Sequence, residues 1–566
     1  MTKAFEEIVN VLIEAGIDYV FGMPGGGTIP IWNAMHGRQD KIKPILARHE
    51  GAASCMADMY GRLTGKPGVL MGQGAYIASS GGFGTMEAFL SNSPMLILVD
   101  TSDGGPFAQH GYNQSGSGEY GSFDIRDILR AMCKFVAYAA TPEEAVHGTQ
   151  LAIKHAVSGR PGPAAVVMRN DAIRGEIDPR RVPKIYPIAG YLKETTMVPP
   201  SDDIERACRL LASAKGPVII AGNGVHLSKS YEEIKDLAEL LGIPVATTYT
   251  GKSAFPEIHP LALGMIGRYG QRTANRVVSE ADVVLACGTR LAPSDTRGES
   301  LIDPLRQKLV QIDIDPRNVG WVFPVEMGLT GELKATLKMV LAALKKMEAE
   351  KGTDVLERTA VLTKIKSDER FFEAPELHSN SIPVLPERIV NAIQEAVTPD
   401  TLLTLDAGNN RLWMTHYFKS LKAGTIFCPG GLAGMAWGPP AAITAKLLNP
   451  DKPVVSVSGD GGFAMTANVL STAVQYKLPI TFVVMNNSLL GMVYDGQEGR
   501  PVATEFIDTD FSTIAKGFGA RGVRIKKPEE ITPAIKEALK ASLPTVIDVI
   551  TDQTQSHFKI TSEGTH

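Results

Sequence analysis

Residues 453–487 read PVVSVSGDGGFAMTANVLSTAVQYKLPITFVVMNN, and this stretch indicates the fold class more clearly than any other. It contains two short apolar runs rich in β-branched residues, separated by a segment long enough for a helix. Such runs are typical of strands that are buried on both faces of a parallel sheet. The stretch therefore predicts a strand–helix–strand unit with both strands in one parallel sheet.

The same pattern recurs along the chain. Apolar runs occur at 95–100, 164–170, 217–224, 281–288, 401–408 and 544–550, with helical stretches between them, as at 230–242 and 528–542. Residues 171–200 and 345–387 are rich in proline or charge and are interpreted as linkers. Cutting there predicts an α/β protein of three doubly wound parallel-sheet domains, over 1–172, 195–345 and 380–553.

Composition excludes several classes of protein. The chain has 566 residues, 44% of them hydrophobic and 21% charged, with a net charge of −4, so nothing indicates a nucleic-acid partner. Five scattered cysteines without a Cys-x-x-Cys pair argue against disulfide scaffolds and zinc ribbons. The N-terminus is predicted to be an amphipathic helix rather than a signal peptide, and no apolar run is long enough to span a membrane. We expect a cytoplasmic protein.

Polar side chains follow both strands of the 453–487 unit. Asp460 lies in Gly-Asp-Gly at the end of the first strand, and Asn487 ends the second. Carboxyl ends of neighbouring parallel strands meet at one edge of a sheet, where α/β folds bind ligands. A carboxylate and an amide oxygen suit Mg²⁺ or Ca²⁺, and the glycines would let a diphosphate approach the backbone. A helix opening near Thr466 could point N–H groups at it.

The motif GDGG, followed by Asn-Asn at 486–487, resembles the thiamine diphosphate (ThDP) signature of one family. That family contains acetohydroxyacid (acetolactate) synthase, pyruvate oxidase and benzoylformate decarboxylase. Segments 20–35 and 48–69 resemble its pyrimidine-binding domain, 216–225, 263–275 and 310–316 its central domain, and 430–447 and 458–493 its diphosphate-binding domain. The resemblance implies a ThDP- and Mg²⁺-dependent enzyme, an acetolactate synthase-like decarboxylase, lyase or carboligase. Such an enzyme makes or cleaves a bond next to a carbonyl of a small substrate.

The resemblance also implies roles for individual residues. Glu50 would bond the pyrimidine N1′, with its pKa raised by burial. Ala433 would accept a bond from the 4′-amino group, and Met435 would hold the cofactor in a bent shape. The metal ligands would be Asp460, Asn487 and the carbonyl of Leu489, and further cofactor contacts would come from Gly459, Gly461, Gly462, Gly491 and Met492. In the family Glu50 and the metal site belong to different subunits, which implies a homodimer or homotetramer with the active site between subunits.

Departures from the family pattern fall where substrate would bind. Residues 73–80 read QGAYIASS in place of TSGPGATN, so Tyr76 and Ile77 replace Pro-Gly. Gly121 stands where synthases carry a catalytic glutamine. The preceding loop, 102–120, could replace that glutamine through Gln109, His110, Tyr112, Asn113 or Gln114, or it is only a surface excursion. We take His110 as its candidate catalytic residue.

A further departure lies at 493–499, VYDGQEG, where Gly496 replaces the tryptophan that favours larger acceptors in synthases. Tyr494, Gln497 and Glu498 become candidate pocket residues, with Tyr494 as a candidate catalytic residue. The alternative is a polar lid without direct substrate contact.

The central domain leaves the second cofactor open. Gly222, Asn275 and Arg290 occupy positions like those of flavin-binding relatives, whereas Ser294 replaces their second arginine. An FAD-dependent, pyruvate oxidase-like enzyme is therefore one alternative. A 2-hydroxyacyl-CoA lyase is another, although residues 408–414 look like the synthase and oxidase form.

Overall fold

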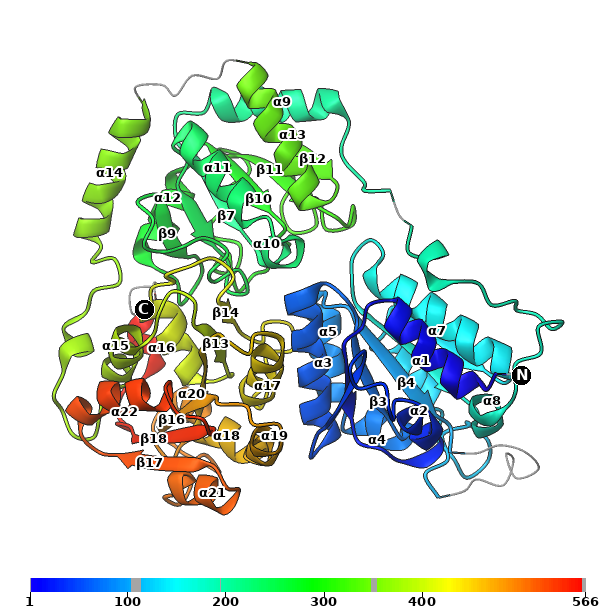
Figure 1. Ribbon diagram of the computed structural model, residues 1–566. Coiled ribbons are helices and arrows are strands. Elements are labelled where there is room, and N and C mark those ends of the chain that lie inside the picture. Colours follow the sequence, from blue (N-terminus) through cyan, green and yellow to red (C-terminus); the bar gives the residue numbers. More distant parts are fainter. Residues whose placement is uncertain (1, 103–112, 194, 348–353, 562–566) are drawn as a thin grey trace. The chain divides into compact units, whose positions relative to one another are not determined.

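The computed structural model describes residues 2–102, 113–193, 195–347 and 354–561, and Figure 1 shows its elements. The chain divides into two compact units. Unit 1 comprises Met1–Thr195, Pro429–Pro450 and Met465–Leu478, and unit 2 comprises Thr196–Cys428, Asp451–Ala464 and Pro479–His566. The described residues form three six-stranded sheets in which all paired strands are parallel. The predicted fold class, three doubly wound parallel sheets, is confirmed.

The first sheet lies in unit 1 and has the strand order β2-β1-β3-β4-β6-β5. Its strands are β1 (Tyr19–Gly22), β2 (Lys43–Leu46), β3 (Gly68–Gly72), β4 (Met95–Asp100), β5 (Phe135–Ala139) and β6 (Pro163–Met168). Its helices are α1 (Ala4–Glu14), α2 (Ile29–Asn33), α3 (Glu50–Thr64), α4 (Gly74–Ser79), α5 (Gly82–Ser91), α6 (Ile125–Arg130), α7 (Pro142–Val157) and α8 (Asn170–Arg174). The helix predicted at the N-terminus is present, and its apolar face joins the core of this sheet.

The central sheet lies in unit 2 and has the order β12-β11-β10-β7-β8-β9. Its strands are β7 (Pro217–Ala221), β8 (Val245–Thr247), β9 (Ala262–Met265), β10 (Val283–Cys287), β11 (Lys308–Asp313) and β12 (Met327–Thr330). Its helices are α9 (Ser201–Ala212), α10 (Asn223–Ser228), α11 (Tyr231–Leu241), α12 (Arg272–Glu280) and α13 (Leu333–Lys346). The linker prediction for 345–387 is wrong in part, because α14 (Asp354–Asp368) forms there and buries Leu362 against this domain's core.

The third sheet has the order β14-β13-β15-β16-β18-β17. Its strands are β13 (Leu402–Leu405), β14 (Ile426–Phe427), β15 (Val454–Gly459), β16 (Thr481–Asn486), β17 (Arg521–Ile525) and β18 (Thr545–Ile550). Nearby in sequence are α15 (Pro386–Ala396), α16 (Asn409–Tyr417), α17 (Gly438–Leu448), α18 (Asp460–Thr466), α19 (Val469–Gln475), α20 (Gly491–Gly496), α21 (Phe511–Gly517) and α22 (Ile531–Ala538). The chain runs from β13 to β14 on one side and continues with β15 on the other, so the topological switch point lies between β13 and β15. This is where open α/β sheets bind ligands.

All five cysteines are buried free thiols, so the chain carries no disulfide bond among them. In the described part of the chain, no helix is long and apolar enough to cross a membrane.

Candidate active site

Asp460 lies at the switch point of the third sheet. It directly follows β15, and the register pairs Gly459 with Met485, so Asp460 and Asn487 leave neighbouring strands at the same edge. Gly459 ends β15, and Gly461 and Gly462 form the first turn of α18. The expected helix start near Thr466 is wrong, since α18 begins at Asp460 and Thr466 is its last residue.

The Asp460 carboxylate is buried and incompletely paired. Its Oδ1 accepts a hydrogen bond of 2.6 Å from the N–H of Gly461. Its Oδ2 has no hydrogen-bond partner among the described residues. Burial raises the pKa of this carboxyl to about 6, although the backbone N–H groups of Gly461 and of residues 487–489 act in the opposite direction. A buried oxygen without a donor is a position that a cation would satisfy.

The other expected ligands fit a hard cation. The loop after β16 brings Asn487 and Leu489 to the same edge, and the carbonyl of Asn487 is held by Gln553 Nε2 at 2.8 Å. An antiparallel bridge pairs Leu489 with Glu505. Leu490 N–H donates to the carbonyl of Thr504, and the carbonyl of Ser488 accepts from Phe506 N–H, each at 2.8 Å. The carbonyl of Leu489 itself takes no part in that bridge. Among the described residues no three His, Cys, Asp or Glu side chains could share a metal, so a cation here needs amide and carbonyl oxygens as well.

Sequence reasoning missed Asn409, which begins α16 on the other side of the switch point. Its Nδ2 lies 3.4 Å from the Asp495 carboxylate, and its buried Oδ1 has no hydrogen-bond partner among the described residues. A Cβ atom at Gly491 would meet Asn409 Nδ2 at 2.8 Å, so a larger residue there would displace the Asn409 amide. The preceding Gly408 has φ of 119°, which favours glycine. A Gly-Asn-Asn turn after an apolar strand was the available signal.

The expected pocket residues after Gly491 have different surroundings in the structure. Met492 and Tyr494 lie on α20, where Met492 is exposed and Tyr494 is partly exposed. Gln497 instead closes the following loop, because its amide bonds both N–H and C=O of Val502 and the hydroxyl of Thr504. The prediction of Gln497 as a pocket residue is therefore not supported, because its amide is used within the loop. The side chain of Glu498 is exposed to solvent.

The C-terminal segment is attached to the same loop. His557 is buried and its Nδ1 lies 2.5 Å from Asp495 Oδ2, while its backbone N–H donates to the same carboxylate at 3.0 Å. Together with Gln553, this residue fixes the C-terminal segment to the loop 487–496. The described part of the tail thus supports the candidate metal loop.

In unit 1, Glu50 is the first residue of α3. His49 precedes it as the N-cap, and its Nδ1 accepts a bond of 3.0 Å from the N–H of Gly51. Glu50 itself is partly exposed in the single chain. The Glu50 side chain at the helix start is therefore partly accessible to solvent in the single chain.

Ala433 and Met435 lie in a turn just before α17. Ala433 has φ of 58° and Ala436 has φ of 81°, so both non-glycine residues are in the left-handed region. Such residues cost about 1–3 kcal/mol each and persist only where the surroundings hold them. The turn containing Met435 is thus a strained conformation that other parts of unit 1 must stabilise.

The substituted segment after β3 forms a polar chain with the loop 102–120. Gln114 Nε2 donates to the Tyr76 hydroxyl at 2.7 Å, and Gln73 Nε2 donates to Gln114 Oε1. Tyr76 is 43% exposed, whereas Ile77 is buried. Gly121 has φ of 84°, and no atom of the described residues lies within 4 Å of where its Cβ would be. Of the loop's candidates, Gln109, His110 and Tyr112 lie outside the described residues.

The central sheet has its switch point between β7 and β10, where a nucleotide would be expected. The two loops there are bonded to each other, with Gly224 N–H donating to Gly288 O at 2.9 Å. Asn275 uses both ends of its amide on the backbone of Gly267, each at 2.9 Å. Arg290 is exposed. These contacts give FAD no added support.

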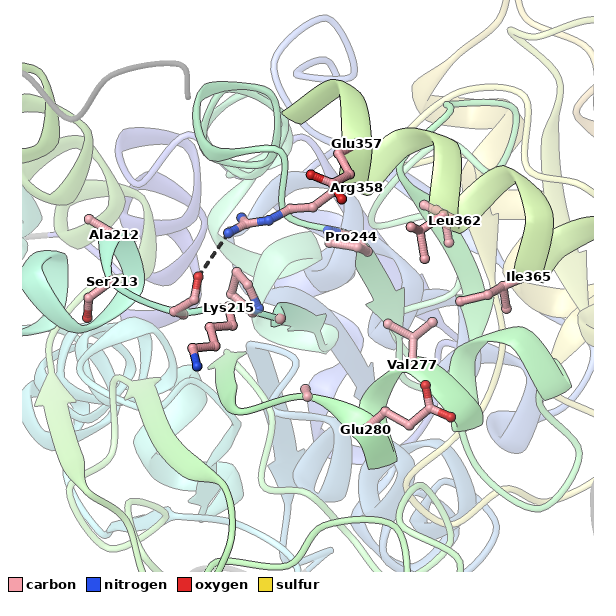
Figure 2. Close-up of a pocket in the computed structure, with 15 residues that line it drawn as sticks. Ala212, Ser213, Lys215, Pro244, Val277, Glu280, Glu357, Arg358, Leu362 and Ile365 are labelled. Atoms are coloured by element: carbon pink, nitrogen blue, oxygen red, sulfur yellow. Dashed lines mark hydrogen bonds between the residues drawn. The ribbon is translucent and has the colours of Figure 1, made fainter. Parts of the chain in front are cut away.

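A cavity of about 560 Å³ lies elsewhere in the central domain, at the amino ends of β7 and β8. Figure 2 shows Val277, Leu362 and Ile365 around it, with Arg358 bonded to the backbone of Ala214. Ligands of parallel sheets bind at the carboxyl ends, so this cavity is separate from the candidate active site.

Comparison with known proteins identifies the class. Thiamine pyrophosphate enzyme domains match the chain in order: the N-terminal TPP binding domain over residues 2–115, the central domain over 204–340 and the C-terminal TPP binding domain over 406–549. The chain therefore belongs to the thiamine pyrophosphate enzyme family, as the sequence resemblance predicted. It is a ThDP-dependent enzyme that acts on a carbon–carbon bond next to a carbonyl.

Individual relatives narrow the comparison. The probable acetolactate synthase large subunit of Methanocaldococcus jannaschii is 33% identical over 98% of this chain and 93% of its own length. The acetolactate synthase large subunit of Corynebacterium glutamicum is 32% identical over 100% of this chain and 89% of its own length. The acetolactate synthase isozyme 3 large subunit of Escherichia coli is 29% identical over 95% of this chain and 92% of its own length.

Proposed function

We propose that the chain is a ThDP- and Mg²⁺-dependent carboligase that decarboxylates a 2-oxo acid and joins the remaining unit to a second carbonyl compound. The observation that carries this proposal is the likeness to acetolactate synthase large subunits over 98% of the chain. The domain boundaries 1–172, 195–345 and 380–553 and a cytoplasmic location belong to the same proposal.

Asp460, Asn487 and the carbonyl of Leu489 would hold Mg²⁺, since the unpaired Asp460 Oδ2 needs a positive charge. The glycines at 459, 461, 462 and 491 would let a diphosphate approach the backbone. Asn409 would offer its unpaired amide oxygen to the same ligand from α16. Met492, the residue after Gly491, would be a further cofactor contact.

Glu50, Ala433 and Met435 would bind the other end of the cofactor. When bound, ThDP supplies an electron sink for breaking the bond beside a carbonyl. Glu50 would share a proton with the pyrimidine N1′, the Ala433 carbonyl would orient the 4′-amino group, and Met435 would hold the cofactor in its bent shape. The partial exposure of Glu50 supports an arrangement in which a second copy of the chain covers it, in a homodimer or homotetramer.

Tyr76, Gln114, Tyr494 and His110 are proposed to contact the substrate. Gln114 donates to the Tyr76 oxygen, which leaves the phenol proton for a substrate carboxylate. Cleavage of a 2-hydroxy carbonyl compound is a second candidate reaction. It is favoured because Gly121 and Gly496 stand where synthases carry side chains. No comparable observation favours an FAD-dependent oxidase or a 2-hydroxyacyl-CoA lyase.

Proton NMR of the ThDP- and Mg²⁺-loaded protein with pyruvate tests the reaction. Acetolactate made by the unmodified protein and not by Glu50→Gln would support the carboligase. Acetaldehyde alone would indicate a simple decarboxylase. No turnover of pyruvate, with cleavage of a hydroxyketone instead, would replace the carboligase by the lyase.

A further inference from the structure

Glu87 has no role in the site described so far, yet its carboxylate accepts hydrogen bonds from the turn that carries Met435. It lies on α5 and is completely buried. Six donors surround it: the N–H groups of Gly430 (3.0 Å), Gly431 (3.1 Å), Leu432 (2.8 Å) and Ala433 (3.0 Å), the guanidinium of Arg62 (2.7 Å) and the hydroxyl of Ser91 (2.6 Å). Four successive N–H groups converging on one anion form a backbone nest.

Asp58 holds the other side of the same turn. Its Oδ2 accepts a bond of 2.7 Å from the indole Nε1 of Trp437, two residues after Met435. Arg62 joins the two carboxylates, since its Nε bonds both oxygens of Asp58 at 3.1 and 3.0 Å and its Nη2 reaches Glu87. The guanidinium also lies over the Trp437 ring, 4.7 Å from the centroid.

The turn fits closely against α5. A Cβ atom at Gly434 would meet Phe83 Cε2 at 2.4 Å, and one at Gly431 would meet Leu90 Cβ at 2.6 Å. Met435 is therefore fixed on both sides, through the nitrogen of Ala433 before it and the indole of Trp437 after it. A strained turn needs such support to keep one conformation.

We propose that Asp58, Arg62 and Glu87 form a carboxylate bracket, a set of positioning residues that holds the Met435 turn in the conformation that binds the cofactor's pyrimidine ring. This inference rests on the proposed roles of Ala433 and Met435. The bracket contacts neither cofactor nor substrate, and it acts through the backbone of residues 430–437.

Glu87→Gln tests the bracket, because an amide of the same shape offers only one accepting oxygen to four N–H groups. We expect backbone amides 430–433 to exchange hydrogen about 10–100-fold faster, as bonds to a charged acceptor are lost. ThDP titrated into the Mg²⁺-loaded protein should bind about 10-fold more weakly, and the circular dichroism band of the bound aminopyrimidine should change. Substrate KM should change less than kcat.

Glu143→Gln is the matched control, since Glu143 is also a buried glutamate of unit 1. Its carboxylate accepts a hydrogen bond of 2.7 Å from the N–H of Asp178, which is not part of the Met435 turn. It should leave ThDP affinity and amides 430–433 unchanged. Should Glu87→Gln not fold, Trp437→Phe removes one bond of the bracket with an aromatic ring retained, and about 3-fold weaker ThDP binding is expected.

Two outcomes separate this inference from the proposed function. A folded Glu87→Gln protein with unchanged ThDP affinity, unchanged circular dichroism and protected amides 430–433 would overturn the bracket. Faster exchange at 430–433 with unchanged ThDP affinity and an unchanged aminopyrimidine band would instead overturn the assignment of Ala433 and Met435 as cofactor contacts, and with it the bracket's role.

Discussion

Glu87 and Asp460 are two buried carboxylates whose pKa values are shifted in opposite directions. Glu87 is surrounded by six donors, and although burial alone would raise its pKa, Arg62, Ser91 and the loop N–H groups lower that pKa to about 2. Asp460 keeps one unpaired oxygen, and burial raises its pKa to about 6. Among the described residues, the first carboxylate thus has donors on both oxygens, whereas one oxygen of the second has none. We infer that the turn around Met435 is preorganised, whereas the proposed metal site at Asp460 becomes complete only with a cation.

The largest effect is expected from Asp460→Asn. Removing the carboxylate of the candidate metal site should weaken Mg²⁺ binding by about 4 kcal/mol, close to ~1,000-fold. Calorimetric titration of Mg²⁺ in the presence of ThDP measures this. The apo protein should be no less stable than the unmodified one, because a neutral amide costs less to bury. A less stable apo variant would contradict the incomplete pairing of Asp460.

Glu87→Gln should give the opposite behaviour, destabilising the apo protein. The lowered pKa of Glu87 corresponds to about 3 kcal/mol relative to an unperturbed glutamate. Since the folded pKa lies below the unfolded one, this stability is present above about pH 4.5 and is lost as the pH falls toward 2. Urea unfolding at several pH values should show the difference between the two proteins shrinking over that window. A difference that stays constant with pH would show that the glutamate charge is not responsible.

A smaller effect tests how closely the turn fits α5. Gly431→Ala places a Cβ 2.6 Å from Leu90 Cβ and should cost about 1–3 kcal/mol through overpacking. Gly496→Ala is the control, because none of the described residues has an atom within 4 Å of the added Cβ, and it should change stability by less than about 0.5 kcal/mol. Thermal unfolding of both proteins makes the comparison. Equal melting temperatures would mean that the turn is not preorganised.

The smallest effect is expected at the C-terminal segment. His557→Ala removes the imidazole from Asp495 and should cost about 1 kcal/mol, since a backbone N–H still bonds that carboxylate. Hydrogen exchange should quicken at 553–561 and at 487–496 but not at 430–433. Faster exchange at the Met435 turn would link the two regions that we treat as independent.

Sequence patterns predicted the three sheets because buried parallel strands leave a local record of β-branched runs. They also placed Asp460 and Asn487 together, since both follow such runs directly and a parallel register brings strand ends to one edge. The expected helix start near Thr466 was wrong, because glycines at 461 and 462 masked a helix that begins at Asp460. The helix α14 inside the supposed linker was missed because the charge-rich sequence at the start of that stretch was interpreted as a linker.

Local features were therefore readable from the residues alone: the strands along the chain, the polar groups at strand ends and the family resemblance. The carboxylate bracket, in contrast, exists only in the folded chain, because Glu87 and the N–H of Gly430 are separated by 343 residues and no local pattern relates them. Folding likewise decided that Gln497 closes a loop and that Asn409 faces Gly491. Periodicity depends only on neighbours along the chain, so the strands and the residues at their ends could be predicted. Long-range hydrogen bonds depend on positions in space, so the contacts of Glu87, Asn409 and Gln497 could not.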